Sequence, residues 1–242
     1  MPEVLAPGDP AGVATLEIMS AAPRYNAWMY EVIAPFVGKR ILEVGSGIGN
    51  MSTHLLDGGP DHLVLTDTDA WYRQHVAARF AGRKEVRIDA LTLPDRGAPA
   101  RFAPDRLDTV VALNVVEHIE DHVGALATIR SILEPSGGRA VILVPAHQPI
   151  YGEMDRELGH YRRYSRASLT AALEAAGFAV GAMFWFNRLG VVGWWLNGRI
   201  RRVRQISIGQ IRGFDALVPG LRFERWLPLP FGLSIIAVGT PA

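Results

Sequence analysis

The chain has 242 residues, 49% of them hydrophobic and 20% charged, which is the composition of an ordinary globular protein with a full core. The formal net charge of +1 argues against nucleic-acid binding, and the absence of cysteine excludes disulfides, thiolate metal sites and a cysteine nucleophile. The first residues show no signal-peptide pattern, and no uncharged apolar run reaches the roughly 20 residues of a membrane helix, so we expect a cytoplasmic protein.

The N-terminal region begins with a stretch rich in Pro, Gly and Ala, residues 1–14, which we expect to lie loose on the surface. Across residues 15–37 apolar side chains recur at helical spacing, and Pro35 and Gly38 close the segment. The residues on or near one face are Tyr25, Trp28, Met29, Ile33 and Phe36. The predicted helix either packs on the core or forms a lid over a ligand site.

The next segment, ILEVGSGIGN at residues 41–50, combines a short apolar strand with a glycine-rich turn and the start of a helix. This is the opening of a nucleotide-binding α/β domain, where glycine permits positive φ angles and close approach of a ligand. The spacing GxGxG differs from the dinucleotide fingerprint GxGxxG, and Glu43 lies two residues before the first glycine. A carboxylate there suits a positively charged ligand better than a diphosphate.

Polar side chains end the strands that follow. Further apolar strands are predicted at residues 62–66, 86–88, 107–113, 139–144, 178–186 and 233–238. Asp67 lies 22 residues after Gly45, close to the spacing expected for a carboxylate that binds ribose hydroxyls, although it could instead cap a helix. Asp89 ends the third strand, where it is either a ligand group or a solvated turn acid, and Asn114 ends the fourth.

The stretch Glu43-Val-Gly45-Ser-Gly47-Ile-Gly49 closely resembles the first motif of class I S-adenosylmethionine (SAM)-dependent methyltransferases, and NVVEHI at 114–119 resembles their fourth. The resemblance covers about residues 20–186 plus the last strand. It implies an α/β fold with a doubly wound, mostly parallel sheet of seven strands in the order 3-2-1-4-5-7-6. It also implies SAM as cofactor and S-adenosylhomocysteine as product. The expected cofactor-binding residues are Tyr25, Glu43, Gly45, Ser46, Gly47, Gly49, Asp67, Thr68, Asp89, Ala90, Leu91 and Asn114.

We expect one methyltransferase domain over residues 1–242. Its core would span about 38–186 plus 232–240, with an N-terminal lid at about 15–37 and an insertion, here called the cap, at about 187–231.

Residues 145–165 form a loop dense in titratable and aromatic groups, which is typical of a functional loop. Its GHYRRY segment resembles one that follows the fifth strand in many bacterial small-molecule methyltransferases. The arginines Arg162, Arg163 and Arg166 are expected on a solvated face. The expected acceptor contacts are Trp28, Met29, His147, Tyr151, Asp155, His160, Tyr161, Trp185 and Trp194.

Methyl transfer from a sulfonium is an in-line displacement, for which the protein mainly supplies alignment and desolvation. A hydroxyl or protonated nitrogen acceptor needs one base, and the candidates are His118, His160 and Tyr151. His118 could equally cap or pack a helix. No metal is expected, because no acid follows the fifth strand until Glu153 and zinc spacing is absent.

The stretch 183–204, MFWFNRLGVVGWWLNGRIRRVR, carries tryptophans followed by an arginine cluster at 199, 201, 202 and 204. It is a strand with a helix that completes the core, a hydrophobic lid over the acceptor, or an interfacial helix at anionic headgroups. We favour the lid. The oligomeric state stays open, a dimer included.

These patterns predict SAM-dependent methylation, at O, N or C, of a small aromatic or apolar acceptor of the secondary-metabolism type, with no nucleic-acid partner. Two alternatives remain. One is a non-catalytic SAM-binding or scaffold protein of the same fold. The other is an NAD-dependent oxidoreductase, which the GxGxG spacing and Glu43 disfavour.

Overall fold

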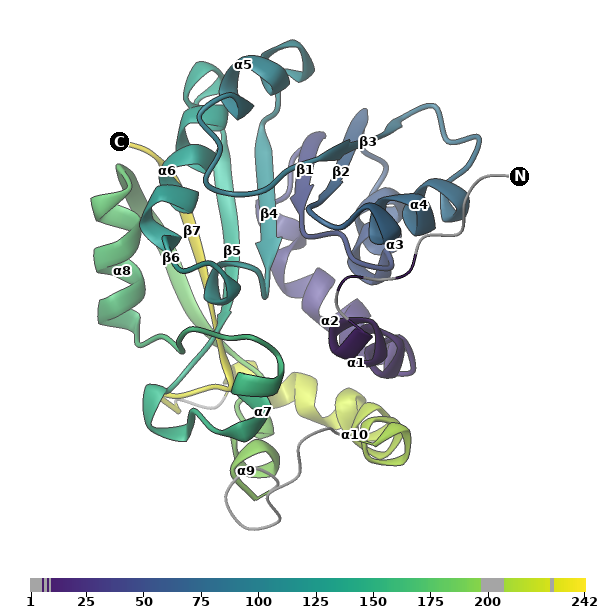
Figure 1. The fold of residues 1–242 in the computed structure, drawn as a ribbon. Helices are drawn as coiled ribbons and strands as arrows, with labels where there is room; N and C mark the ends of the chain where they lie inside the picture. Colours follow the sequence, from purple (N-terminus) through teal and green to yellow (C-terminus); the bar gives the residue numbers. More distant parts are fainter. Residues whose placement is uncertain (1–5, 7, 9, 197–206, 227–228) are drawn as a thin grey trace.

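A computed structural model describes residues 6, 8, 10–196, 207–226 and 229–242, and within them a seven-stranded sheet has helices on both faces (Figure 1). The strands are β1 (Arg40–Val44), β2 (His62–Asp67), β3 (Val86–Ala90), β4 (Thr109–Leu113), β5 (Arg139–Pro145), β6 (Phe178–Phe186) and β7 (Ser234–Pro241). Their order, β3-β2-β1-β4-β5-β7-β6, confirms the predicted topology. Strands β1 to β5 pair in parallel, and β7 pairs antiparallel with both of its neighbours.

The helices follow the strands in the alternation typical of doubly wound folds. They are α1 (Pro10–Ser20), α2 (Pro23–Ile33), α3 (Asn50–Asp57), α4 (Ala70–Arg79), α5 (Ala98–Phe102), α6 (His122–Leu133), α7 (Glu153–Glu157), α8 (Arg166–Ala175), α9 (Gly190–Trp195) and α10 (Ile208–Leu221). Short 3-10 turns include η1 (Ala34–Phe36), η3 (Val116–His118), η5 (Gln148–Ile150) and η7 (Arg222–Trp226).

The core consists of two apolar layers, one on each face of the sheet. Helices α5, α6 and α8 cover one face, and α2, α3, α4 and α10 cover the other. Residues 140–144 of β5 are buried on both faces, which explains why the central strands are continuous apolar runs instead of alternating patterns. Neither apolar layer covers the carboxyl ends of the parallel strands, where the site residues lie.

The N-terminal region differs from the prediction in two ways. Residues 10–14 are helical, not loose, and the expected single helix is broken between α1 and α2. Proline explains the break, because Pro23 has no backbone N–H to donate and its fixed φ suits the first turn of a new helix. Asn26 Nδ2 donates to the carbonyl of Met19 at 3.0 Å and so holds the two helices together.

The loop at 145–165 is more ordered than the sequence suggested. It contains η5 and α7, and a parallel bridge joins Ala146 to Tyr164. The predicted solvated face is wrong for Arg163, which is only 4% exposed and donates to Asp155 Oδ1 at 2.7 Å. The loop therefore rests on a buried ion pair.

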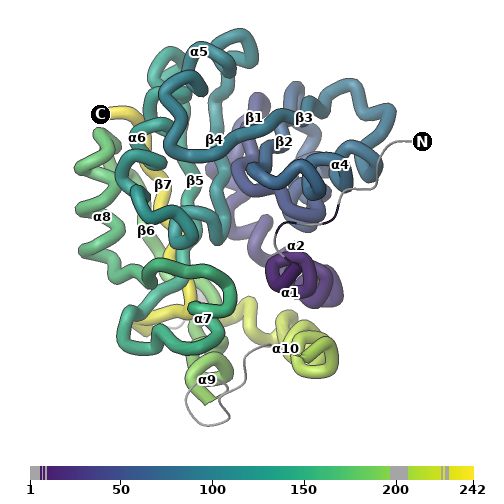
Figure 2. Tube along the Cα trace, viewed as in Figure 1, coloured from purple at the N-terminus to yellow at the C-terminus, as the bar shows by residue number. Residues whose placement is uncertain are grey.

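Helices α1, α7, α9 and α10 gather at the lower end of the molecule, beyond the carboxyl ends of β1, β4 and β5 (Figures 1 and 2). Buried Asp215 of α10 accepts a hydrogen bond from the backbone N–H of Tyr25 at 2.8 Å, so the cap is tied to α2. The predicted arginine cluster at 199–204 lies outside the described residues. Within the described part of the chain, no helix is both long and apolar enough to cross a bilayer.

Candidate functional site

A cavity of about 1050 Å³ lies between the carboxyl ends of the parallel strands and the cap helices. The lining groups on the strand side include Gly45, Gly47, Asp67, Thr68, Leu91 and Asn114. The lining groups on the cap side include Leu189, Trp194, Ile211, Phe214 and Leu217. Sites for one small ligand usually measure about 300–1,000 Å³, so this cavity lies at the upper end of that range.

The turn after β1 needs glycine at two positions that line the cavity. Gly45 has φ +73° and Gly47 has φ +51°, in the left-handed region that side chains disfavour. A Cβ on Gly45 would lie 2.7 Å from Val115 Cγ2, and one on Gly47 would lie 2.6 Å from Leu16 Cδ1. Helix α1 and the loop after β4 thus close directly over the turn.

Asp67 ends β2 and lines the cavity. Its Oδ2 accepts from the N–H of Gly47 and its Oδ1 from the N–H of Asp69, both at 3.0 Å. Helix α4 is capped by Asp69, which accepts from the N–H of Trp71, so Asp67 is not the capping residue. Burial raises the pKa of Asp67, and the carboxylate keeps lone pairs that can accept from a vicinal diol in the cavity.

Glu43 does not line the cavity. It is buried on the α3 side of β1, and its Oε2 accepts from the hydroxyl of Ser52 at 2.5 Å. Burial raises the pKa of Glu43 to about 8. Four more predicted cofactor residues also lie outside the lining: Ser46, Gly49, Asp89 and Ala90. The Glu43 side chain therefore links β1 to α3, the two elements that flank the glycine turn, and it does not face the cavity.

Replacing Glu43 with glutamine is expected to change how stability depends on pH. In the native protein the Glu43 carboxyl is protonated up to about pH 8, whereas in the unfolded chain it ionises near pH 4.5. Its contribution to stability is full below pH 4.5 and is lost as the pH rises toward 8, a fall on the order of a few kcal/mol. Urea unfolding of ligand-free protein at several pH values should show a smaller decline for Glu43→Gln. An equal decline of stability with rising pH in the native protein and in Glu43→Gln would contradict a buried neutral carboxyl at Glu43.

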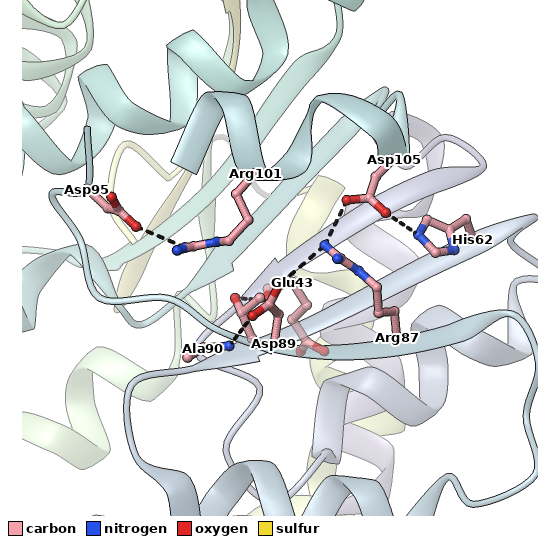
Figure 3. Close-up of polar contacts among 9 residues, drawn as sticks. Glu43, His62, Arg87, Asp89, Ala90, Asp95, Arg101 and Asp105 are labelled. Carbon is pink, nitrogen blue, oxygen red and sulfur yellow. Dashed lines mark hydrogen bonds and ion pairs between the residues drawn. The ribbon is translucent and has the colours of Figure 1, made fainter. Parts of the chain in front are cut away.

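Asp89 belongs to a polar network along β3 and not to the cavity (Figure 3). Its Oδ1 accepts from the N–H of Ala90 at 2.8 Å, and its Oδ2 lies 3.5 Å from Arg87 Nη2. The same Arg87 nitrogen donates to Asp105 at 2.7 Å, and Asp105 also contacts His62. Asp89 is therefore a half-buried strand residue, which differs from both the predicted ligand group and the solvated turn acid.

Several residues predicted for cofactor, acceptor or catalysis do line the cavity: Tyr25, Met29, His118, His160 and Trp194. The other predicted acceptor residues have structural partners instead. Trp28 packs on Phe186 with ring centroids 4.6 Å apart, and His147 stacks on Trp185 at 5.2 Å. Neither pair lines the cavity, although both lie close to the cap.

The remaining predicted residues of the 145–165 loop also lie away from the cavity. The Tyr151 hydroxyl donates to the backbone carbonyl of His160 at 2.6 Å, which argues for a structural role. Asp155 is fully buried beside Arg163, and Tyr161 is 53% exposed. The residues of this loop that line the cavity are Pro145, Leu158, His160 and Arg163.

The cavity residues that the sequence analysis missed include Arg163 and Asn187. Arg163 places its guanidinium 4.6 Å from the ring centroid of Trp194. Asn187, buried with φ +57°, follows β6, and its Oδ1 accepts from the N–H of Gly190 at 3.0 Å. Burial raises the pKa of Tyr25 to about 12, so its hydroxyl stays protonated and bonds to Asn187. A polar residue directly after an apolar strand was the available signal for Asn187.

Glu117, His118 and His160 form a cluster at the cavity wall, where the turn after β4 meets the 145–165 loop. One ligand atom from each lies within 4.8 Å of the other two, and the imidazole centroids are 4.6 Å apart. Burial raises the pKa of Glu117 to about 8, against the opposing effects of its own backbone and of Arg163. The two histidines that the sequence proposed as bases are thus neighbours.

Comparison with known proteins identifies the family. Residues 21–182 match the family model described as "Methyltransferase domain". An uncharacterized methyltransferase of Mycobacterium tuberculosis is 29% identical over 64% of this chain and 58% of its own length. A ubiquinone biosynthesis O-methyltransferase of Cereibacter sphaeroides is 32% identical over 43% of this chain and 40% of its own length. The chain thus spans less than two thirds of either relative.

Among solved structures, a Haloferax volcanii methyltransferase in complex with its activator Trm112 superposes with a TM-score of 0.63. The two share 17% identity, and the superposition covers 98% of this chain and 100% of that one. At this identity the likeness concerns the fold alone. The family match spans well over half of the chain. The chain therefore belongs to the methyltransferase-domain family.

Proposed function

We propose that this enzyme transfers the methyl group of SAM to a small, largely apolar organic acceptor of the natural-product type. The observation that carries the proposal is one continuous cavity with two different halves. Its strand side presents the glycine turn and Asp67, and its cap side presents Leu189, Trp194 and Phe214. A polar cofactor fits the first half and an apolar acceptor fits the second.

In the cofactor half, the Asp67 carboxylate accepts from the ribose hydroxyls, and Leu91 packs against the adenine ring. The turn at 45–47 lets the chain of the cofactor approach the backbone. The sulfonium then lies near Asn114, which ends β4 and lines the cavity. We assign α1, α2, α9 and α10 to a lid over both ligands.

In the acceptor half, the chemistry needs a nucleophilic atom in line with the methyl–sulfur bond. Exclusion of water by the cap and close positioning supply most of the acceleration, because the methyl group is already activated. Deprotonation of the acceptor is assigned to the His118–His160 pair, which lines the cavity. The name of the Cereibacter sphaeroides relative favours a hydroxyl oxygen as the methyl acceptor.

The proposal is tested first by calorimetric titration of the purified protein with SAM, with NAD as the control ligand. We expect SAM to bind and NAD not to bind, because the GxGxG turn lacks the dinucleotide spacing. Aromatic and prenylated phenols are then screened for methylated product by mass spectrometry. SAM binding without product from any acceptor would favour the non-catalytic alternative, and NAD binding would favour an oxidoreductase.

Replacing Trp194 with alanine is expected to raise the KM for the acceptor about tenfold while SAM affinity stays within twofold. The indole lies on the cap side of the cavity, and truncation of an aromatic side chain in such a pocket commonly costs more than about 1 kcal/mol. Trp195→Ala is the matched control, because Trp195 is 45% exposed and does not line the large cavity. Equal effects of the two substitutions, or a larger loss of SAM affinity, would contradict the assignment.

A further inference from the structure

The cluster of Glu117, His118 and His160 joins two segments that are far apart in the sequence. Glu117 and His118 belong to η3 after β4, and His160 belongs to the loop after α7. The backbone N–H of Tyr161 donates to the carbonyl of Glu117 at 2.9 Å. Arg162 donates to the carbonyls of Ile119 and Glu120. These bonds hold the two segments together, so the fold itself places the three side chains near one another.

Glu117 is a buried acid without a matching cation. Its side chain is fully buried, and within the described part of the chain neither carboxylate oxygen has a hydrogen-bond partner outside Glu117 itself. Arg163 is the buried guanidinium nearby, but it already pairs with Asp155 at 2.7 Å. Two buried carboxyl groups thus face one buried guanidinium. A buried carboxylate in this position requires either a proton or a cation.

His160 is oriented as a metal ligand would be. Its Nδ1 lies 2.9 Å from Asp155 Oδ1, and that carboxylate is held in turn by Arg163 and by the N–H of Gly152. A histidine that donates one ring N–H to a carboxylate presents its other nitrogen as an electron-pair donor. His118 lines the cavity from the opposite segment, with its ring edge-on to His160.

We propose that Glu117, His118 and His160 bind one divalent transition-metal ion, zinc in the first place, at the wall of the cavity. One carboxylate and two imidazoles are a donor set typical of zinc and other first-row ions, whereas magnesium and calcium prefer oxygen alone. Tetrahedral ligand atoms about 2.1 Å from one zinc ion lie about 3.4 Å apart. The ligand atoms of the three residues lie within 4.8 Å of one another, so binding an ion would draw them together by up to about 1.4 Å. Three protein ligands leave positions open toward the cavity.

The chemical consequence rests on the proposed methyl transfer. An acceptor hydroxyl that binds an open position through its oxygen loses its proton more readily, and the proton passes to solvent. An oxygen lone pair then forms the bond to the methyl carbon while the methyl–sulfur bond breaks, with its electron pair going to sulfur. The products are the methyl ether and S-adenosylhomocysteine. The ion would thus select acceptors with an ionisable hydroxyl, and the histidines would act through it.

The test measures metal binding without turnover. Protein stripped with EDTA is titrated with Zn²⁺ in competition with a chromophoric chelator, and bound zinc is counted by elemental mass spectrometry. We expect one zinc per chain. Glu117→Gln and His118→Ala should each weaken zinc binding at least tenfold, whereas His75→Ala, which removes an exposed imidazole of α4, should leave it unchanged. Mg²⁺ should not compete.

The variants are chosen to stay folded, so that weaker zinc binding reports loss of a ligand and not unfolding. Glu117→Gln preserves side-chain shape, and His118 is exposed, so its truncation leaves the core intact. Absence of stoichiometric zinc binding by the native protein, or unchanged zinc affinity in either variant, overturns the proposal. SAM titration of the same samples separates the two ideas, because SAM binding without zinc removes only the metal site, and zinc binding without SAM removes only the proposed cofactor role.

Discussion

Replacing Asp67 with alanine is expected to weaken SAM binding by about 100-fold. Hydrogen bonds to a charged group contribute about 1.5–3 kcal/mol each, and Asp67 is positioned to accept from both ribose hydroxyls. The substitution also frees the N–H of Gly47, which now donates to Asp67 Oδ2 at 3.0 Å, so the glycine turn loses its support. Calorimetric titration with SAM measures the change, and Asp67→Asn, which keeps the shape, should lose less.

Asp69→Ala provides the matched control for this experiment. Asp69 caps α4 and does not line the cavity, so its loss should lower stability by about 1 kcal/mol and leave SAM affinity within twofold. Equal losses of affinity in the two alanine variants would show that Asp67 acts through local structure. An unchanged affinity in Asp67→Ala would remove it from the cofactor site.

Replacing Arg163 with methionine is expected to lower the free energy of unfolding by about 3–5 kcal/mol. The substitution leaves the fully buried Asp155 without its cation, and it also removes the bond from Arg163 Nη1 to the carbonyl of Ala146 at 3.0 Å. Removing one partner of a buried pair costs far more than removing a surface charge. Urea unfolding at neutral pH measures the difference.

Arg166→Met is the control for this second experiment, because Arg166 belongs to the same arginine run but is exposed at the start of α8. We expect it to change stability by less than about 0.5 kcal/mol. If both variants lose similar stability, the buried pair is not what holds the 145–165 loop. A loss below about 1 kcal/mol in Arg163→Met would lead to the same conclusion.

The strands and the glycine turn could be predicted because their signals are local. Apolar runs, glycine spacing and polar residues at strand ends lie within ten residues of one another, and the structure confirms β6 at its predicted bounds, residues 178–186. The direction of a side chain from such a strand is not local. Glu43 alternates with Leu42 and Val44 and so points toward α3, where Ser52 receives it. The sequence contains Ser52 but does not pair it with Glu43.

The arginine run shows the same limit on the acceptor side. Arg162, Arg163 and Arg166 look alike in the sequence, and only the position of Asp155 on α7 decides which one is buried. The cluster at Glu117 likewise depends on a residue 43 positions later, His160, that the topology brings back to the end of β4. The sequence shows which charged residues are present, but which of them form pairs depends on tertiary packing.

The position of β7 has a consequence for how the protein is made. This strand is the last in the chain, yet it lies between β5 and β6 and supplies the pairing partner of both. During synthesis on the ribosome, β6 therefore has no place in the sheet until residues 234–241 have emerged. Until then β5 presents an open edge that could pair with another nascent chain. Dependence on chaperones should accordingly be greatest between the emergence of β6 and that of β7.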